Sequence, residues 1–75
     1  MSTRVTVSNL SQRTTANDLH GLFNRSGLVM SVSVTPDRHF PTGYVDMSSP
    51  EAAEAAVAAL NGSTLHENQI TVRVG

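Results

Sequence analysis

Four short segments of the chain alternate apolar with polar residues. They occupy residues 4–8, 29–35, 40–47 and 70–74, and valine supplies many of their apolar positions. A period of two is typical of a strand that buries one face, and β-branched side chains favour that conformation. Residues 36–37, Pro-Asp, favour a turn after the second segment. The pattern therefore predicts four strands.

A helix is predicted between the first and the second strand. Thr15 and Asp18 have the spacing of a helix N-cap and its capping-box partner. The apolar residues that follow share one helical face: Leu19, Leu22 and Phe23. We expect this helix to end at Gly27.

A second helix is predicted between the third and the fourth strand. Ser49 is a favourable N-cap, Pro50 suits the first turn, and Glu51 complements the positive end of the helix dipole. Its buried stripe is expected to consist of Ala53, Ala56, Val57 and Leu60. Asn61 and Gly62 end it, since both residue types adopt the left-handed C-cap conformation.

The predicted order of elements is βαββαβ. Two βαβ-type halves with right-handed crossovers give a four-stranded antiparallel sheet with both helices on one face, an α+β sandwich of the ferredoxin-like class. A chain of 75 residues builds one small core, so residues 1–75 are expected to form a single domain. The other face of the sheet stays open. Its expected side chains are Arg4, Thr6, Ser8, Ser31, Ser33, Thr35, Phe40, Thr42, Tyr44, Asp46, Thr71 and Arg73.

Composition narrows the class of protein. Apolar residues make up 39% of the chain and charged residues 15%, with no apolar stretch long enough to cross a membrane and no signal-peptide pattern at the start. Cysteine is absent, which excludes disulfides and thiolate metal sites. We therefore expect an intracellular protein, in the nucleus or the cytoplasm, without a membrane partner.

The charge balance argues against tight, indiscriminate binding to nucleic acid. The net charge is −1, whereas counterion release by an excess of basic residues supplies most non-specific affinity. All five basic residues are arginine, whose guanidinium pairs with phosphate and stacks on bases. A shallow dependence of binding on salt is expected.

Catalysis is not predicted. His20, His39 and His66 fall on a helix and two loops, and no two of them have the i, i+4 spacing of a metal pair. The sequence also lacks a glycine-rich phosphate loop, a nucleophile elbow and paired carboxylates. We expect a non-enzymatic protein without a cofactor or a metal.

Four stretches, taken in order, resemble the RNA-recognition motif family. Residues 5–10, Val-Thr-Val-Ser-Asn-Leu, fit five of the six positions of the family's strand-one hexamer. Residues 15–27 carry the Asp-Leu and Leu-Phe pairs of its first helix, and residues 40–47 resemble the second half of its strand-three octamer. Residues 51–62 resemble its second helix with the Leu-Asn-Gly exit. The resemblance covers nearly the whole chain and implies the strand order 4-1-3-2.

The same resemblance indicates which positions stack RNA bases, and two of the three have lost their ring. The family's aromatic positions correspond to Thr6, Thr42 and Tyr44, so Tyr44 is the retained platform. Phe40 stands where the octamer usually has a cation, and the alternation would place it on the face of Tyr44. The alternatives are that a terminal segment or helix covers Tyr44 and that Phe40 caps the core.

Further residues of the expected site are polar. Thr6, Thr42 and Ser8 are candidates for hydrogen bonds to bases or ribose, although strands commonly carry such residues in contact with solvent. Arg4 and Arg73 are candidates for phosphate contacts or stacking, with a cross-strand ion pair between Arg4 and Asp46 as the alternative for Arg4. The complete RNA-binding set is Tyr44, Thr6, Thr42, Phe40, Arg4, Ser8, Arg38 and Arg73.

The resemblance implies binding of single-stranded RNA on the open sheet by a monomeric domain, with low affinity or low specificity because rings are missing. The alternative is a member of the family that docks a protein partner within a ribonucleoprotein complex. The missing rings favour this alternative, whereas the polar outer faces of the helices oppose it.

Overall fold

The computed structural model describes residues 3–75, and residues 1 and 2 of the expected domain lie outside this part. Within it the four main strands are β1 (Arg4–Ser8), β2 (Val29–Thr35), β3 (Thr42–Met47) and β6 (Thr71–Val74). The helices are α1 (Ala16–Phe23) and α2 (Pro50–Leu60), and two short strands are β4 (Thr64–Leu65) and β5 (Asn68–Gln69).

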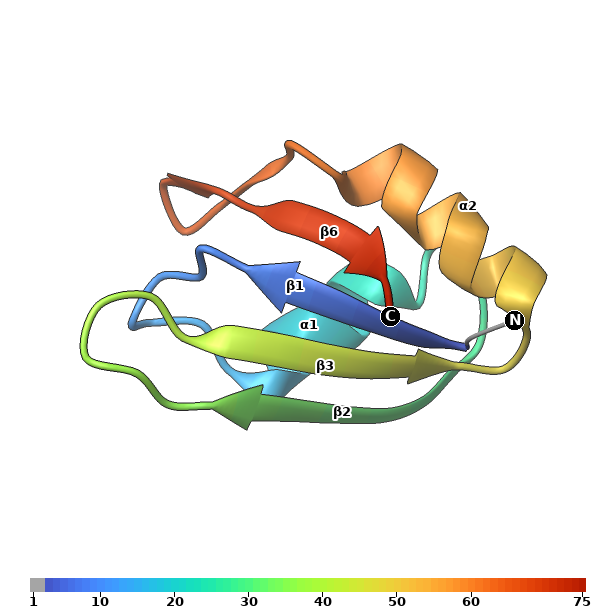
Figure 1. Ribbon diagram of the computed structural model, residues 1–75, viewed down its shortest axis with the longest axis horizontal. Helices are drawn as coiled ribbons and strands as arrows, with labels where there is room; N and C mark the ends of the chain where they lie inside the picture. Colours follow the sequence, from blue (N-terminus) through green and yellow to red (C-terminus); the bar gives the residue numbers. More distant parts are fainter. Residues whose placement is uncertain (1–2) are drawn as a thin grey trace.

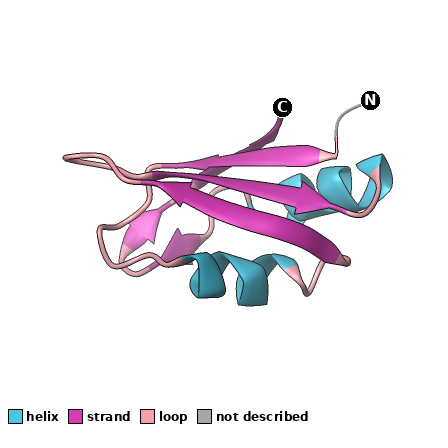
Figure 2. Ribbon diagram, turned by 90° about the horizontal axis from the view of Figure 1, so that it is seen from below, coloured by secondary structure: helices cyan, strands magenta, loops and turns pink. Residues whose placement is uncertain are grey.

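The main sheet has the order β2-β3-β1-β6, and all its neighbouring strands are antiparallel. Figure 1 shows these strands side by side, with α1 behind them and α2 beyond β6, and Figure 2 shows the helices on one side of the sheet. This confirms the expected α+β sandwich and the order 4-1-3-2, since β6 is the fourth main strand. One face of the sheet is free of helices.

The core lies between the sheet and the helices, and the alternation of the strands decides what enters it. Val5 and Val7 of β1 are completely buried, as expected from their period of two. Eleven further residues are buried with them: Leu10, Leu19, Phe23, Val29, Val45, Met47, Ala53, Ala56, Leu60, Ile70 and Val72. Val57 was expected in the buried stripe of α2 but is only partly buried, and it packs against this core. The alternation of β6 also predicted a buried Val74, but this residue is 40% exposed and lies outside the core cluster.

Both helices begin where the sequence predicts. The Thr15 hydroxyl accepts a hydrogen bond from the Asp18 amide at 3.2 Å, and the Asp18 carboxylate accepts one from the Thr15 amide at 3.0 Å, which completes the capping box. Ser49 caps α2 by accepting a bond from the Ala52 amide at 3.1 Å. These bonds satisfy amide groups that have no partner within the helix.

The expected end of the first helix at Gly27 is wrong. Helix α1 ends at Phe23, with Asn24 as its C-cap in the right-handed region. Gly27 lies further along, where a β-carbon would come within 2.8 Å of the Ala52 β-carbon. Its small size therefore permits a close approach to α2 and does not serve to terminate α1.

The expected inclusion of Phe40 in the third strand is also wrong. Strand β3 begins at Thr42, so the alternation that was to align Phe40 with Tyr44 does not apply. Phe40 lies in the loop of residues 36–41 and is 55% exposed, outside the residues that pack against the core. The alternative in which Phe40 caps the core is therefore also wrong.

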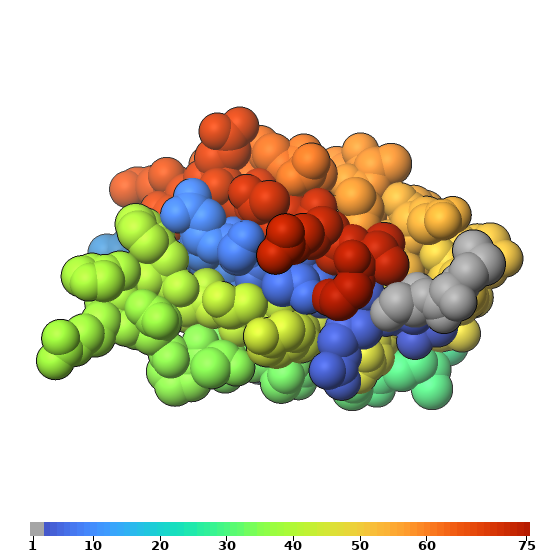
Figure 3. All heavy atoms as spheres, in the orientation of Figure 1, coloured from blue at the N-terminus to red at the C-terminus, as the bar shows by residue number. Residues whose placement is uncertain are grey.

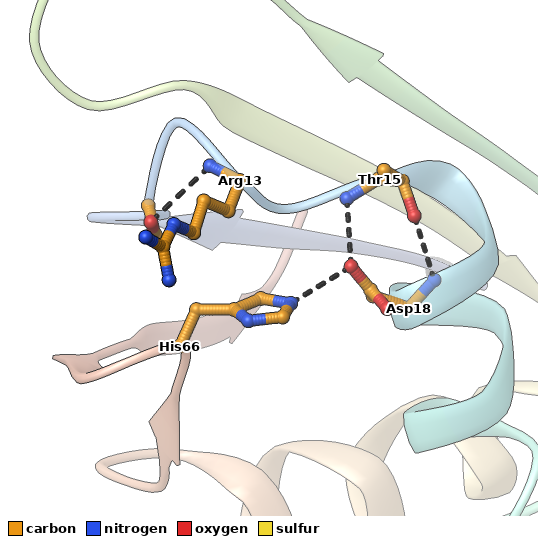
Figure 4. A network of polar contacts seen from close by, with 5 residues as sticks. Arg13, Thr15, Asp18 and His66 are labelled. Carbon is orange, nitrogen blue, oxygen red and sulfur yellow. Dashed lines mark hydrogen bonds and ion pairs between the residues drawn. The ribbon is translucent and has the colours of Figure 1, made fainter.

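A small hairpin between α2 and β6 was not predicted. Strands β4 and β5 pair through a turn in which His66 and Glu67 have φ values of 50° and 70°. Such turns usually contain Asn-Gly or Asp-Gly, so His-Glu gave no recognisable signal. As Figure 4 shows, His66 Nε2 lies 2.9 Å from Asp18 Oδ2, which joins the hairpin to the start of α1. This contact and the Thr15 amide hold the pKa of Asp18 below its ordinary value.

The Leu-Asn-Gly exit of α2 has a structural role. The side-chain oxygen of Asn61 accepts a hydrogen bond from the Val72 amide at 3.0 Å, so the end of α2 is joined to β6. Gly62 has a φ of +83°, a left-handed conformation that side chains disfavour. The predicted end of α2 at these two residues is confirmed, but only Gly62 adopts the left-handed conformation, because Asn61 is extended with φ −62° and ψ 126°.

Within residues 3–75, no helix has the length and apolar character needed to cross a membrane. In the same part of the chain, no three or more His, Cys, Asp or Glu side chains are grouped so that they can hold a metal ion.

Two glycines make a matched test of core packing. A β-carbon at Gly43 would lie 2.5 Å from Leu19 Cδ1 and 3.2 Å from Leu10 Cδ1, so Gly43→Ala should lower the free energy of unfolding by about 1 to 3 kcal/mol. A β-carbon at Gly21, on α1, would meet no atom within 4 Å. Gly21→Ala should therefore raise the free energy of unfolding by roughly 0.5 to 1 kcal/mol. Urea unfolding of both variants checks this, and equal effects would contradict it.

Candidate nucleic-acid interface

A row of side chains crosses the open face of the sheet. The strand register places Tyr44 of β3 opposite Thr6 of β1 on one side and opposite Ser33 of β2 on the other. Thr6 is in turn opposite Arg73 of β6. The four strands therefore bring one ring, two hydroxyls and one guanidinium into line, in agreement with the expected outer face.

Tyr44 is half-buried at the centre of this face, and its nearest cation is Arg4. The Arg4 Cζ atom lies 5.7 Å from the centre of the ring, within the range of a cation–π contact. No helix covers the ring, because both helices lie on the other side of the sheet (Figure 2). The arrangement leaves a partly exposed aromatic surface beside a positive charge.

Arg4 and Asp46 form the expected cross-strand ion pair. Arg4 Nε donates to Asp46 Oδ1 at 3.2 Å, and the Ser31 hydroxyl donates to Asp46 Oδ2 at 2.8 Å. The Arg4 guanidinium, followed by the Ser31 hydroxyl, holds the pKa of the Asp46 carboxyl below its ordinary value. The pair is exposed to solvent, so it orients Arg4 more than it stabilises the fold.

Thr6, which occupies the family's first aromatic position, contacts the end of the chain. Its hydroxyl donates to the carbonyl of Gly75, while the Gly75 amide donates to the Arg4 carbonyl at 2.9 Å. Figure 3 shows the C-terminal residues standing out on this face of the molecule. The backbone of Gly75 therefore borders the row at Thr6 but leaves Tyr44 partly exposed.

The remaining residues of the predicted site lie at the edges of the face. Ser8 pairs with Thr71, and Thr42 pairs with Thr35, toward one end of the sheet. Arg38 and Phe40 are exposed in the loop of residues 36–41, which projects beyond that end in Figure 1. The structure thus brings together Tyr44, Thr6, Arg4 and Arg73 and sets the loop residues apart from them.

Gln12 contacts the same loop and was not predicted. Its side-chain nitrogen donates to the backbone carbonyls of Asp37, Arg38 and His39 at 2.9 to 3.0 Å. No local pattern indicates this contact, because a glutamine in a loop is common and its partners lie 25 to 27 residues away.

The sequence of residues 5–71 matches the family described as RNA recognition motif. The chain belongs to the RNA recognition motif family. Among curated relatives, it is 40% identical over 73 residues to small ribosomal subunit protein cS22 of Arabidopsis thaliana, covering 92% of this chain and 29% of that protein. It is 38% identical over 77 residues to the 28 kDa chloroplastic ribonucleoprotein of Spinacia oleracea, covering 97% of this chain and 33% of that protein.

This RNA recognition motif spans a third or less of the length of these relatives. Among solved structures, it resembles the RNA-binding protein PG1 with a TM-score of 0.87 and 29% identity, covering 99% of this chain and 94% of that one. The spinach protein is named as chloroplastic. The chloroplast differs from the two compartments expected for this chain from its sequence, the nucleus and the cytoplasm.

The ion pair at this face can be tested by titration. In Arg4→Gln, the pKa of Asp46 should rise toward its ordinary value and stay partly lowered by the Ser31 hydroxyl. Since the folded-state pKa is the lowered one, stability from Asp46 is fully present above the ordinary pKa and is lost as the pH falls through the folded value. Carboxyl NMR shifts measured against pH report the pKa, and an unchanged value in Arg4→Gln would show that the pair is not formed in solution.

Proposed function

We propose that this RNA recognition motif binds single-stranded RNA on the open face of its sheet, with Tyr44 as the base-stacking residue. The observation that carries this proposal is the partly exposed ring of Tyr44 at the centre of a helix-free sheet face, with Arg4 against it. A nucleobase stacks on an aromatic ring whatever its sequence, and a neighbouring guanidinium contacts the phosphate or adds a cation–π contribution.

The relatives support binding to RNA. The spinach protein is a ribonucleoprotein, the Arabidopsis protein is a ribosomal subunit component, and PG1 is an RNA-binding protein by their names. RNA recognition motif domains are generally non-enzymatic, and we propose the same for this chain.

Weak binding with little sequence preference is part of the proposal. One ring stands where the family has three, and each stacked ring is worth about 1 to 3 kcal/mol by alanine substitution. Hydroxyls of Thr6 and Thr42 replace the other two rings, and the Thr6 hydroxyl is already bonded to Gly75. We also propose that the isolated domain is monomeric and works inside the cell.

A second candidate function is docking of a protein partner within a ribonucleoprotein complex. Leu28, just before β2, and Met30, near the start of β2, favour it, because they are 62% and 66% exposed and β2 is an edge strand of the sheet. Exposed apolar side chains beside an unpaired strand edge are typical of protein contacts. Binding of RNA remains the preferred proposal because the ring and two arginines share the open face.

Tyr44→Ala should weaken binding of a random-sequence single-stranded RNA by roughly 5- to 150-fold, which corresponds to the loss of one stacked ring. Tyr44→Phe should bind almost as wild type, because the ring is retained. Fluorescence anisotropy with a labelled oligomer measures both affinities, and single-stranded DNA in parallel reports selectivity for ribose.

The control for this experiment is His20→Ala, an exposed residue of α1 on the other side of the sheet, which should leave the affinity unchanged. Equal affinities of wild type and Tyr44→Ala would remove the ring from the mechanism. No binding of RNA by the wild type even at high concentration would favour the protein-docking function.

The salt dependence of binding should be shallow. With two or three phosphate contacts, a plot of log affinity against log salt should have a slope of about −1.4 to −2 for a single strand. Arg73→Ala should make this slope less negative by about 0.7, because one contact is lost. A slope steeper than about −4 would contradict the small number of contacts.

A further inference from the structure

The side chain of Gln12 is at the centre of an unusual group of hydrogen bonds. Its nitrogen lies 2.9 Å from the Asp37 carbonyl oxygen, 3.0 Å from that of Arg38 and 2.9 Å from that of His39. Only the nitrogen of the amide fits here, because its oxygen would repel three carbonyl oxygens. An amide has two hydrogens, so at least one of them is shared between acceptors.

Two more bonds hold the same loop, residues 36–41. The Leu10 amide donates to the Pro41 carbonyl at 3.3 Å, and the His39 amide donates to the Asp37 carboxylate at 3.0 Å. Leu10 and Gln12 both belong to the segment between β1 and α1, which lies beside the loop in Figure 1. The segment between β1 and α1 therefore donates hydrogen bonds to four backbone carbonyls of the loop of residues 36–41.

This arrangement determines what the loop presents to solvent. The carbonyl oxygens of residues 37–39 point toward Gln12 and accept its hydrogen bonds. Their partial negative charges therefore do not face an approaching phosphate. The side chains of Arg38, His39 and Phe40 remain exposed, and Phe40 is 55% exposed. An exposed ring next to a guanidinium has the chemistry for stacking a base and contacting a phosphate.

We propose that Gln12 is a positioning residue that preorganises the loop of residues 36–41 as a second contact for single-stranded RNA, with Phe40 stacking and Arg38 contacting phosphate. The inference rests on the proposed RNA-binding function. Ordering a loop during binding costs affinity, so a loop that is fixed beforehand binds more tightly. Gln12 need not touch RNA, since it acts through the loop.

The first test is Gln12→Met, which keeps the size of the side chain and removes its donors. RNA affinity should fall about two- to tenfold, and amide order parameters of residues 37–40 should decrease. The matched control is Gln69→Met, because the Gln69 nitrogen donates to a single carbonyl, that of Gly62, in a different part of the chain. This control should leave both the affinity and the loop unchanged.

Two further variants separate positioning from a general structural role. If Gln12 acts by presenting Phe40 and Arg38, then Gln12→Met should cost little affinity in a background that carries both Phe40→Ala and Arg38→Ala, so the effects should not add. Gln12→Lys supplies three donors to the same carbonyls and should restore the order of the loop. Its rescue is judged by the order parameters, because the added charge itself attracts RNA.

The outcomes distinguish this inference from the proposed function. If Tyr44→Ala weakens RNA binding while Gln12→Met leaves it unchanged, the second contact is wrong and the function stands. The second contact is equally wrong if the effect of Gln12→Met simply adds to that of the combined Phe40→Ala and Arg38→Ala changes. If the wild type fails to bind RNA, both are overturned.

Discussion

The structure depends on the pairing of the central strand β1 with two neighbours at once. Val5 lies opposite Val45 on one side and Val74 on the other, and Val7 lies opposite Gly43 and Val72. Both β1 valines are completely buried, and each contributes about 1.5 to 3 kcal/mol by leaving water. Because side chains alternate along a strand, the burial of these two fixes Arg4, Thr6 and Ser8 on the opposite face.

The two helices can cover only one face of so small a sheet, and the chain fixes them there by specific contacts. The Asn61 side chain bonds to the Val72 amide, and Gly43 leaves room for Leu10 and Leu19 to pack on the sheet. Apart from these elements, residues 3–75 contain only the small hairpin of β4 and β5, which contacts α1 through His66 and Asp18. The surface proposed to bind RNA is thus a consequence of how the core is closed.

The open face has few groups with which to attract an anion, and some of them are already engaged. Arg4 contacts both the Tyr44 ring and the Asp46 carboxylate, so the charge beside the ring is partly neutralised within the protein. The Thr6 hydroxyl bonds to Gly75. In the proposed function, affinity for RNA therefore comes from one ring, from Arg73, from the partly neutralised Arg4, and from the loop of residues 36–41.

Sequence by itself determined the elements whose causes are local. The period of two marks the buried face of each strand, and the capping groups of Thr15 and Ser49 act within three residues of the helix start. Alternation also predicted that Tyr44 lies on the open face, whereas the order of the sheet and the expected stacking role of Tyr44 came from the resemblance to a family, which carries tertiary information that the residues alone do not state.

Tertiary structure alone decided the features that depend on residues far apart in the chain. Phe40 was misplaced because the start of β3 depends on where its pairing with β2 ends, at Thr35 and Thr42. The bonds of Gln12 and the contact of His66 with Asp18 span 25 to 48 residues, so no local pattern signals them. Local periodicity fixes which face a side chain takes, whereas packing fixes which distant group it meets.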